Sequence, residues 1–319
     1  MISQVGDIKV MKELVKWKFK MKYSSTFKIK TEFNFRIRHA FINWLNNIDI
    51  TGFRKIAHLA PKLIIPSPST NGVIKLPNGL KFWIDPVNDN GVERSLYYTG
   101  SYESGTLDFI KNHLKKGDCF VDVGANIGLM SIEASKAVGS EGTIYSFEPH
   151  PNTVKILRFN IDLNSIKNIH VIEKGVGSKS GEAEIYDRWD VNRGGASLLS
   201  SNSENESYDI EVVTLDEAFQ NIDVKMIKMD IEGFELEALK GAKNILSSEN
   251  PPILIVECTE ETEHQNYTRE QLYSWLKNIN GKYSFYKLKG SKSRKSKLIE
   301  ITDDSELPTH DNLFCMPQE

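Results

Sequence analysis

The most informative part of this sequence is residues 121–128, which read Val121-Asp122-Val123-Gly124-Ala125-Asn126-Ile127-Gly128. The apolar run from Cys119 to Val123 predicts a buried strand, and the pattern from Ile127 to Ala137 predicts a helix directly after it. The glycines of the connecting turn, Gly124 and Gly128, let a ligand approach the backbone N–H groups at the start of that helix. The stretch therefore predicts a ligand-binding turn between a strand and a helix.

The spacing of these glycines narrows the choice of ligand. The dinucleotide fingerprint G-x-G-x-x-G needs glycine at positions 126 and 129, where this chain has Asn126 and Leu129. Pyrophosphate binding is therefore disfavoured, and a cofactor without phosphates fits better. Glu148 ends the next predicted strand, and an acidic side chain at that place can accept both hydroxyls of an adenosine ribose. The alternative is that Glu148 is a solvated carboxylate of the loop.

On both sides of this turn, short apolar runs alternate with helical patterns. Strands are predicted at 119–123, 143–147, 169–172, 226–229, 253–256, 282–287 and 312–316. Helices are predicted at 127–137, 152–163, 234–246 and 269–277. Strands joined by crossover helices form a parallel sheet covered on both faces, so the predicted fold class is α/β with a Rossmann-like, mostly parallel sheet.

Two hairpins are predicted outside this alternation. The first joins 72–76 to 80–84 through the turn Pro77-Asn78-Gly79. The second joins 182–186 to 208–213 within the long connection between the third and fourth strands. We expect this second hairpin at the edge of the sheet.

The charge is distributed unevenly along the 319 residues. Residues 1–62 hold 13 Lys and Arg against 4 Asp and Glu, whereas the rest of the chain holds 27 against 39. Pro61, Pro66 and Pro68 then indicate a linker. We therefore expect a basic, mostly helical N-terminal extension with its linker at 1–70 and a second domain at 71–319.

The basic extension allows two interpretations. It could form a helical cap that packs on the second domain or contacts another copy of the chain in a homo-oligomer. Alternatively, residues 1–62 could make a peripheral contact with an anionic membrane surface. The acidic remainder disfavours a nucleic-acid partner.

The sequence also predicts where the protein resides. It contains no run of about 18 apolar residues, which a spanning helix needs. Its first residues lack the apolar core of a secretory signal. Three scattered cysteines are too few for a disulfide framework or a zinc site. We expect a cytoplasmic protein, with membrane association through the extension as the alternative.

Acidic residues follow the fourth and fifth predicted strands. Asp230 and Glu232 come directly after strand four, and their side chains share a face if the backbone stays extended. Such a pair repels unless a proton, a metal or a cationic group bridges it. Alternatively, Asp230 caps the next helix and Glu232 complements its dipole. Glu257 ends strand five, where it could instead pair with a lysine.

These motifs together resemble a known family of proteins. The turn at 121–128 is similar to motif I of class I S-adenosylmethionine-dependent methyltransferases, and its sequence resembles that of the FkbM family. The resemblance extends from about Gly91 to Pro317, which defines the core of the second domain as 91–317. The stretches that carry it are Gly91-Val92-Glu93, Tyr102-Glu103, Phe120 to Gly128, Phe147-Glu148-Pro149, Asp230-Ile231-Glu232-Gly233, Leu239-Lys240-Gly241-Ala242 and Val256-Glu257.

The resemblance implies a seven-stranded sheet, S-adenosyl-L-methionine as cofactor, and roles for individual residues. Four residues would line the methionine end of the cofactor, namely Asp122, Gly124, Asn126 and Gly128. Glu148 would hold the ribose, Glu103 would close over the methionine moiety, and Asp230 would touch the cofactor's amino group.

The resemblance also implies the chemistry. The family acts on hydroxyls of sugars, glycolipids and polyketides, so the acceptor would be a glycan or small molecule. Asp230 is the first candidate to orient or deprotonate the acceptor, with Glu232 and Glu257 as alternates. A divalent metal would also acidify a hydroxyl, but no histidine lies beside these carboxylates in sequence, so no metal ligands are assigned. The alternatives are an N-methyltransferase of a small molecule or protein, and a non-catalytic cofactor-binding assembly partner.

Overall fold

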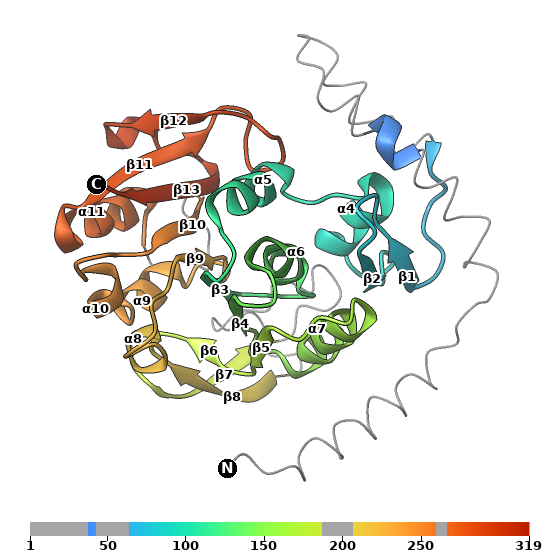
Figure 1. The fold of residues 1–319 in the computed structure, drawn as a ribbon, viewed down its shortest axis with the longest axis horizontal. Coiled ribbons are helices and arrows are strands. Elements are labelled where there is room, and N and C mark those ends of the chain that lie inside the picture. The colour runs from blue at the N-terminus through green and yellow to red at the C-terminus, as the bar shows by residue number, and fades with distance from the viewer. Residues whose placement is uncertain (1–37, 43–63, 187–206, 260–266, 319) are drawn as a thin grey trace.

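The alternating strands and helices form one large sheet with helices on both faces (Figure 1). The computed structural model describes residues 38–42, 64–186, 207–259 and 267–318. Across the eight-stranded sheet, the strands follow the order β12-β11-β13-β10-β9-β3-β4-β5. They are β3 (Cys119–Val123), β4 (Thr143–Phe147), β5 (Ile169–Ile172), β9 (Met226–Met229), β10 (Ile253–Thr259), β11 (Tyr283–Leu288), β12 (Leu298–Ile301) and β13 (His310–Pro317).

The direction of the strands confirms the predicted Rossmann-like, mostly parallel sheet. Strands β5, β4, β3, β9 and β10 are parallel neighbours. Strand β13 runs antiparallel to both β10 and β11, and β12 runs antiparallel to β11. All seven predicted strands are present, and β12 is an eighth, at the edge. Only one of its four residues, Ile301, is buried, so its sequence carries little of the pattern of a half-buried strand.

The helices form one layer on each face of the sheet, because the strands alternate their side chains between two apolar clusters. In β3, Phe120 belongs to one cluster and Val121 to the other, and both side chains are completely buried. The first layer contains α4 (Val92–Thr99), α5 (Ser104–His113), α6 (Leu129–Val138) and α7 (Pro151–Leu163). The second contains α8 (Leu215–Ala218), α9 (Glu235–Lys240), α10 (Lys243–Leu246) and α11 (Arg269–Asn280). A short 3-10 helix, η3 (Asp304–Glu306), precedes β13.

The helix predicted at 234–246 is in fact broken into α9 and α10 at Gly241. A Cβ atom at Gly241 would lie 2.0 Å from the carbonyl oxygen of Gly177, so the chain passes another backbone segment at this point. The apolar pattern continues through the break, which explains why the sequence predicts one continuous helix.

Both predicted hairpins are present, but the second has a different place. β1 (Gly72–Lys75) pairs with β2 (Lys81–Ile84), and β7 (Gly181–Tyr186) pairs with β8 (Ser207–Val213). The second hairpin does not extend the large sheet as expected. It forms a separate three-stranded sheet, because β8 pairs in parallel with β6 (Gly175–Val176) on its other side.

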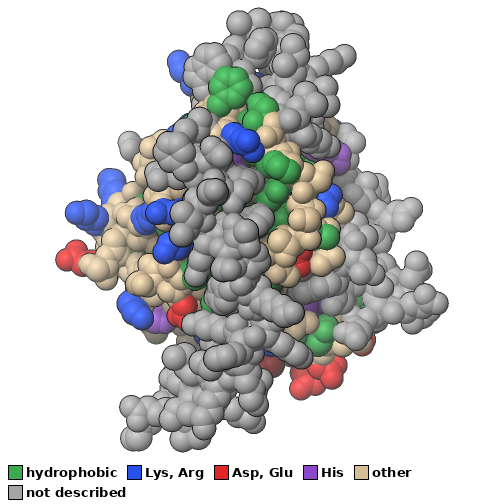
Figure 2. All heavy atoms as spheres, turned by 90° about the vertical axis from the view of Figure 1, so that its right-hand side faces the viewer, with side chains coloured by type: hydrophobic (Ala, Val, Ile, Leu, Met, Phe, Trp, Pro, Cys, Tyr) green, Lys and Arg blue, Asp and Glu red, His purple; other side chains and the backbone are tan. Residues whose placement is uncertain are grey.

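Most of the basic extension lies outside the described residues, and with it the predicted helices and the membrane contact of residues 1–62. Within the described part, Ile42 and Ile65 are buried in the same apolar cluster as the hairpin β1–β2. Figure 2 shows this side of the molecule, where Lys and Arg side chains lie mainly toward the left of the described surface and hydrophobic ones near its middle. None of the helices in the described ranges combines the length and apolar character that crossing a bilayer requires.

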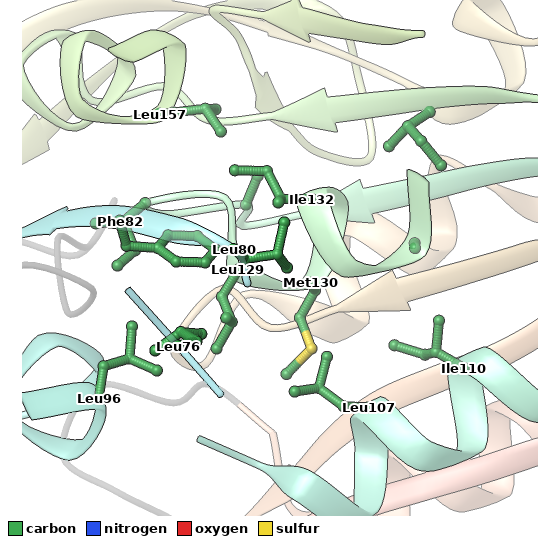
Figure 3. Packing of buried hydrophobic residues seen from close by; sticks show 14 of the residues in the cluster. Leu76, Leu80, Phe82, Leu96, Leu107, Ile110, Leu129, Met130, Ile132 and Leu157 are labelled. Carbon is green, nitrogen blue, oxygen red and sulfur yellow. The ribbon is translucent and has the colours of Figure 1, made fainter. Parts of the chain in front are cut away.

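The hairpin β1–β2 joins the core through large apolar side chains. Figure 3 shows Phe82 and Leu80 of the hairpin facing Leu129 of α6 and Leu96 of α4. Phe82 is completely buried. The start of the predicted domain at residue 71 is thus part of the same packed unit as the helices behind the ligand-binding turn.

We expect Phe82→Ala to lower the free energy of unfolding by about 3–5 kcal/mol, because it removes a large buried side chain and leaves a cavity. Val87→Ala is the matched control, since Val87 is 41% exposed, and it should change stability by about 0.5 kcal/mol or less. Chemical denaturation of both variants measures the difference. Equal stabilities would mean that the hairpin is not part of the cooperative core.

Candidate active site

A pocket lies at the carboxyl ends of the central strands. It is lined by residues that follow β3, β4 and β9 and by the end of β10, among them Gly124, Glu148, Asp230 and Glu257. Strand β3 has β4 on one side and β9 on the other, so the chain crosses over in opposite directions from this point. The pocket therefore occupies the topological switch point, where open α/β sheets bind their ligands.

The turn after β3 approaches the end of β9 so closely that it requires a glycine. A Cβ atom on Gly124 would lie 1.9 Å from the carbonyl oxygen of Asp230, and its φ of 80° also favours glycine. The N–H of Asp230 in turn donates to the carbonyl of Val123 at 3.0 Å. The backbone thus joins the glycine turn to the carboxylates that follow β9.

Glu148 lies in the pocket with both carboxylate oxygens held by backbone. The N–H of Asn126 donates to Oε2 at 2.8 Å and the N–H of His150 to Oε1 at 3.0 Å. Burial raises the pKa of Glu148 to about 7, although the two N–H donors oppose the shift. Each oxygen keeps a lone pair for a further donor, so Glu148 can accept a diol such as that of a ribose.

The four residues expected at the methionine end separate into two groups. Gly124 and Asn126 line the pocket, and the buried Oδ1 of Asn126 has no hydrogen-bond partner among the described residues, which fits a ligand donor at this place. Asp122 does not line the pocket, since it is completely buried and accepts from Ser131 Oγ at 2.5 Å. Gly128 does not line it either, because a Cβ there would meet Leu157 at 2.4 Å.

Glu103 is also behind the wall of the pocket. It is 2% exposed, its Oε1 lies 3.0 Å from Lys292 Nζ, and its Oε2 accepts from Asn312 Nδ2 at 3.2 Å. Its neighbour Tyr102 lines the pocket instead. The structure therefore places Glu103 against a lysine, rather than over the methionine moiety as the resemblance implies.

Two lysines complete the site, and sequence reasoning missed both. Lys228 Nζ lies 2.9 Å from Asp230 Oδ2, and Lys292 Nζ lies 2.6 Å from Glu257 Oε1. Lys228 is 4% exposed in the centre of an apolar strand, and this placement was a signal for a buried ion pair. Lys292 lies in the polar loop after β11, where no spacing rule points to the site. These are the cations that hold the neighbouring carboxylates together.

The pKa values of Asp230 and Glu257 are shifted in opposite directions. Burial alone would raise the pKa of Asp230, but the charges of Lys228 and Lys292 hold it below its usual value. The charge of Asp230, and then burial, raise the pKa of Glu257 to about 8, against the effect of Lys292. At neutral pH, Asp230 is therefore ionised, while Glu257 favours its protonated form.

Glu232 does not share a face with Asp230 as an extended backbone would require. Its φ is 53° and that of Gly233 is 94°, so the chain turns sharply after β9. The N-cap residue of α9 is Phe234, which makes no side-chain cap hydrogen bond. Instead Glu235 accepts from the N–H groups of Ile231 at 2.9 Å and Gly233 at 3.0 Å. Glu232 still lines the pocket.

Within the described ranges, no group of three or more His, Cys, Asp or Glu side chains is arranged to hold a metal ion. The close carboxylates are instead bridged by ammonium groups.

The fold and this site define a class I S-adenosylmethionine-dependent methyltransferase domain: a Rossmann-like sheet with a glycine turn after β3, a ribose-type carboxylate after β4 and acidic residues after β9. The chain belongs to the family of the methyltransferase FkbM domain, whose model matches residues 122–283. S-adenosyl-L-methionine as the cofactor is confirmed by this membership.

Relatives of known name are also methyltransferases. The chain is 27% identical to hexuronic acid methyltransferase AglP of Haloferax volcanii over 170 residues, 52% of this chain and 66% of AglP. It is 28% identical to methyltransferase sdnD of Sordaria araneosa over 163 residues, which cover 40% of this chain and 62% of sdnD. The chain thus spans less than two thirds of the length of either relative. Among solved structures, a putative rRNA-methylase of Clostridium thermocellum has a TM-score of 0.41 and 16% identity, covering 66% of this chain and 92% of that one.

We expect cofactor affinity to fall as the pH falls, because Glu148 must be a carboxylate to accept two ribose hydroxyls. In the free protein its pKa is raised to about 7, so at lower pH binding must first remove a proton. Affinity should be about tenfold weaker at pH 6 than at pH 8. Calorimetry with S-adenosylhomocysteine at both pH values measures it.

Glu148→Gln is the control for this prediction, since residue 148 then cannot titrate and the remaining pH dependence is that of the ligand and of other groups in the pocket, such as Glu257. The variant should bind more weakly by about 1.5–3 kcal/mol at pH 8. If the wild-type protein and the variant have the same pH dependence, Glu148 does not hold the ribose.

Proposed function

We propose that this protein transfers a methyl group from S-adenosylmethionine to a hydroxyl of a sugar, a glycolipid or another natural product. The observation that carries the proposal is the pair Asp230 and Glu257, which lies in the same pocket as Glu148. A carboxylate that can accept hydrogen bonds from a ribose and a second carboxylate that can take a proton, both in one pocket, suit an O-methyltransferase. The sugar as acceptor is supported by the similarity to a hexuronic acid methyltransferase.

Several residues would hold the cofactor. Glu148 would accept the ribose hydroxyls, the unpartnered Oδ1 of Asn126 would accept a further donor, and the anionic Asp230 would face the positively charged amino group. When bound, S-adenosylmethionine supplies a methyl group that its sulfonium has already activated. The chain therefore has to position the acceptor hydroxyl and take its proton, and positioning alone can supply about 7–11 kcal/mol.

The two carboxylates differ in their fitness to take that proton. A general base works best when its pKa is near the working pH. Glu257, with a pKa raised to about 8, meets this condition. Asp230, the first candidate from sequence, is a weak base, because Lys228 and Lys292 lower its pKa against the effect of burial. We therefore propose that Glu257 takes the proton of the acceptor hydroxyl and that Asp230 orients the cofactor and the acceptor.

The test is an assay with methyl-labelled S-adenosylmethionine and a panel of acceptors. The panel should contain uronic acid glycans, neutral glycans and glycolipids, so that a labelled product also identifies the class of acceptor. Label in an ether-linked methyl group supports the proposal. Cofactor binding without labelled product from any acceptor of the panel would count against it.

We expect Glu257→Gln to lower turnover by about 10²–10⁴-fold with little change in cofactor affinity, because it removes the proton acceptor and keeps the shape. Asp230→Asn should also weaken cofactor binding, by about 1.5–3 kcal/mol if the carboxylate holds the amino group. Initial rates and calorimetry separate the two effects. Glu232→Gln is the matched control on the same pocket wall and should retain turnover within about threefold. A large loss of turnover in Glu232→Gln, with normal rates in Glu257→Gln, would mean that Glu232 is the proton acceptor.

A further inference from the structure

The loop between β11 and β12 is strongly basic and sends one of its lysines into the site. Residues 289–297 contain five Lys and Arg. The side chain of Lys292 is 18% exposed and lies within 3.0 Å of both Glu103 and Glu257. Lys295, in contrast, is 62% exposed and pairs with Asp108 at the surface. Of these two lysines, Lys292 is the one that contacts Glu257, a carboxylate of the pocket.

Backbone groups hold this loop in place. The N–H of Lys292 donates to both oxygens of Asp311, at 2.7 and 2.9 Å. Its carbonyl accepts from the N–H groups of Gly105 at 2.9 Å and Thr106 at 3.3 Å, at the start of α5. Ser104 Oγ donates to the carbonyl of Ser293 at 2.6 Å. None of these bonds uses the ammonium group, so a substitution of the Lys292 side chain changes the charge while the loop stays docked.

We propose that Lys292 is a positioning residue that keeps Glu257 available as a proton acceptor, while Lys228 holds Asp230 as a permanent anion. This inference rests on the proposed methyl transfer. The two lysines thereby give different tasks to two carboxylates that would otherwise share one site. Lys292 acts through Glu257 and does not itself contact the reacting atoms.

The charges around Glu257 explain why the site needs Lys292 in addition to Lys228. Among the described groups that act on Glu257, Asp230 and Glu232 are acidic and Lys292 is the cation, while Lys228 is paired with Asp230. The charged groups that act on Glu257 are Asp230, Glu232 and Lys292. The groups that act on these partners are Lys228, Tyr102, Glu103 and Asp311. A buried carboxylate among like charges keeps its proton unless a cation is near.

Removal of the Lys292 charge should raise the pKa of Glu257. Lys292 lowers the pKa of Glu257 against the effects of Asp230 and burial. In Lys292→Gln the midpoint of the Glu257 titration should therefore rise by about 1–3 pH units, the usual effect of one close opposite charge. The acid limb of the turnover profile should move to higher pH by the same amount, which is about tenfold in rate per unit below the midpoint. The KM for the cofactor should stay nearly constant.

The test reads Glu257 directly and therefore does not depend on knowing the acceptor. The full chain is labelled with ¹³C at the glutamate carboxyl carbons, and the Glu257 signal is identified by its loss in Glu257→Gln. Its midpoint is measured by NMR between pH 5 and 10 in wild type, Lys292→Gln, Lys292→Arg and Lys295→Gln. The expected result is a raised midpoint in Lys292→Gln, a wild-type value in Lys292→Arg, and no change in Lys295→Gln, which loses the same charge from the same loop.

If Lys292→Gln does not fold, Glu103→Gln provides a second test, in which the midpoint of the Glu257 titration should shift in the opposite direction. It removes the other anion on Lys292, so the midpoint of Glu257 should fall. An unchanged midpoint in folded Lys292→Gln, or a midpoint that does not fall in Glu103→Gln, would overturn the role of Lys292. The outcome is separate from the proposed function: failure to methylate any acceptor leaves the NMR result intact, whereas a normal midpoint shift with turnover profiles that do not follow it would remove Glu257 as the proton acceptor.

Discussion

The close contact between the turn after β3 and the end of β9 sets the geometry of the whole site. Gly124 stands so near the carbonyl of Asp230 that no side chain fits between them, and the N–H of Asp230 bonds to the carbonyl of Val123. On the other side, the N–H groups of Gly124 and Ala125 donate to the carbonyl of Phe147, just before Glu148. Backbone hydrogen bonds therefore tie the turn before Glu148 to the acidic end of β9, and methyl transfer depends on such fixed positions.

This compactness creates an electrostatic problem that the two lysines solve. Burying a carboxylate is costly, and burying several beside one another is more so unless cations are placed between them. Lys228 lies under Asp230 from within the sheet, and Lys292 reaches Glu257 and Glu103 from the edge loop. The resulting network is unevenly charged, and this unevenness separates an anion that stays ionised from a carboxyl group that can exchange its proton.

The sequence predicts the parallel sheet and the glycine turn well, because both depend on local patterns. The buried strand at 119–123, the turn at Gly124 and the acid at 148 are each visible within a few residues. The proton-transfer half was only partly predictable. Glu257 was named, but Lys292 reaches it from a loop 35 positions later, and the positive φ of Glu232 depends on a tight turn that propensity does not encode. Asp122 and Gly128 do not line the pocket, and a motif identifies positions without showing which of them face it.

The edge of the sheet also contacts the residues around the pocket. Strand β13 supplies Asp311, which holds the backbone of Lys292, and Asn312, which bonds to both Glu103 and Thr106. Glu148 follows β4, whereas the cation that contacts Glu257 comes from the loop between β11 and β12, which Asp311 of β13 holds. The two halves meet at Asp230, whose carbonyl limits Gly124 while its carboxylate pairs with Lys228. The last strands of the chain therefore supply the groups that hold Lys292 beside Glu257.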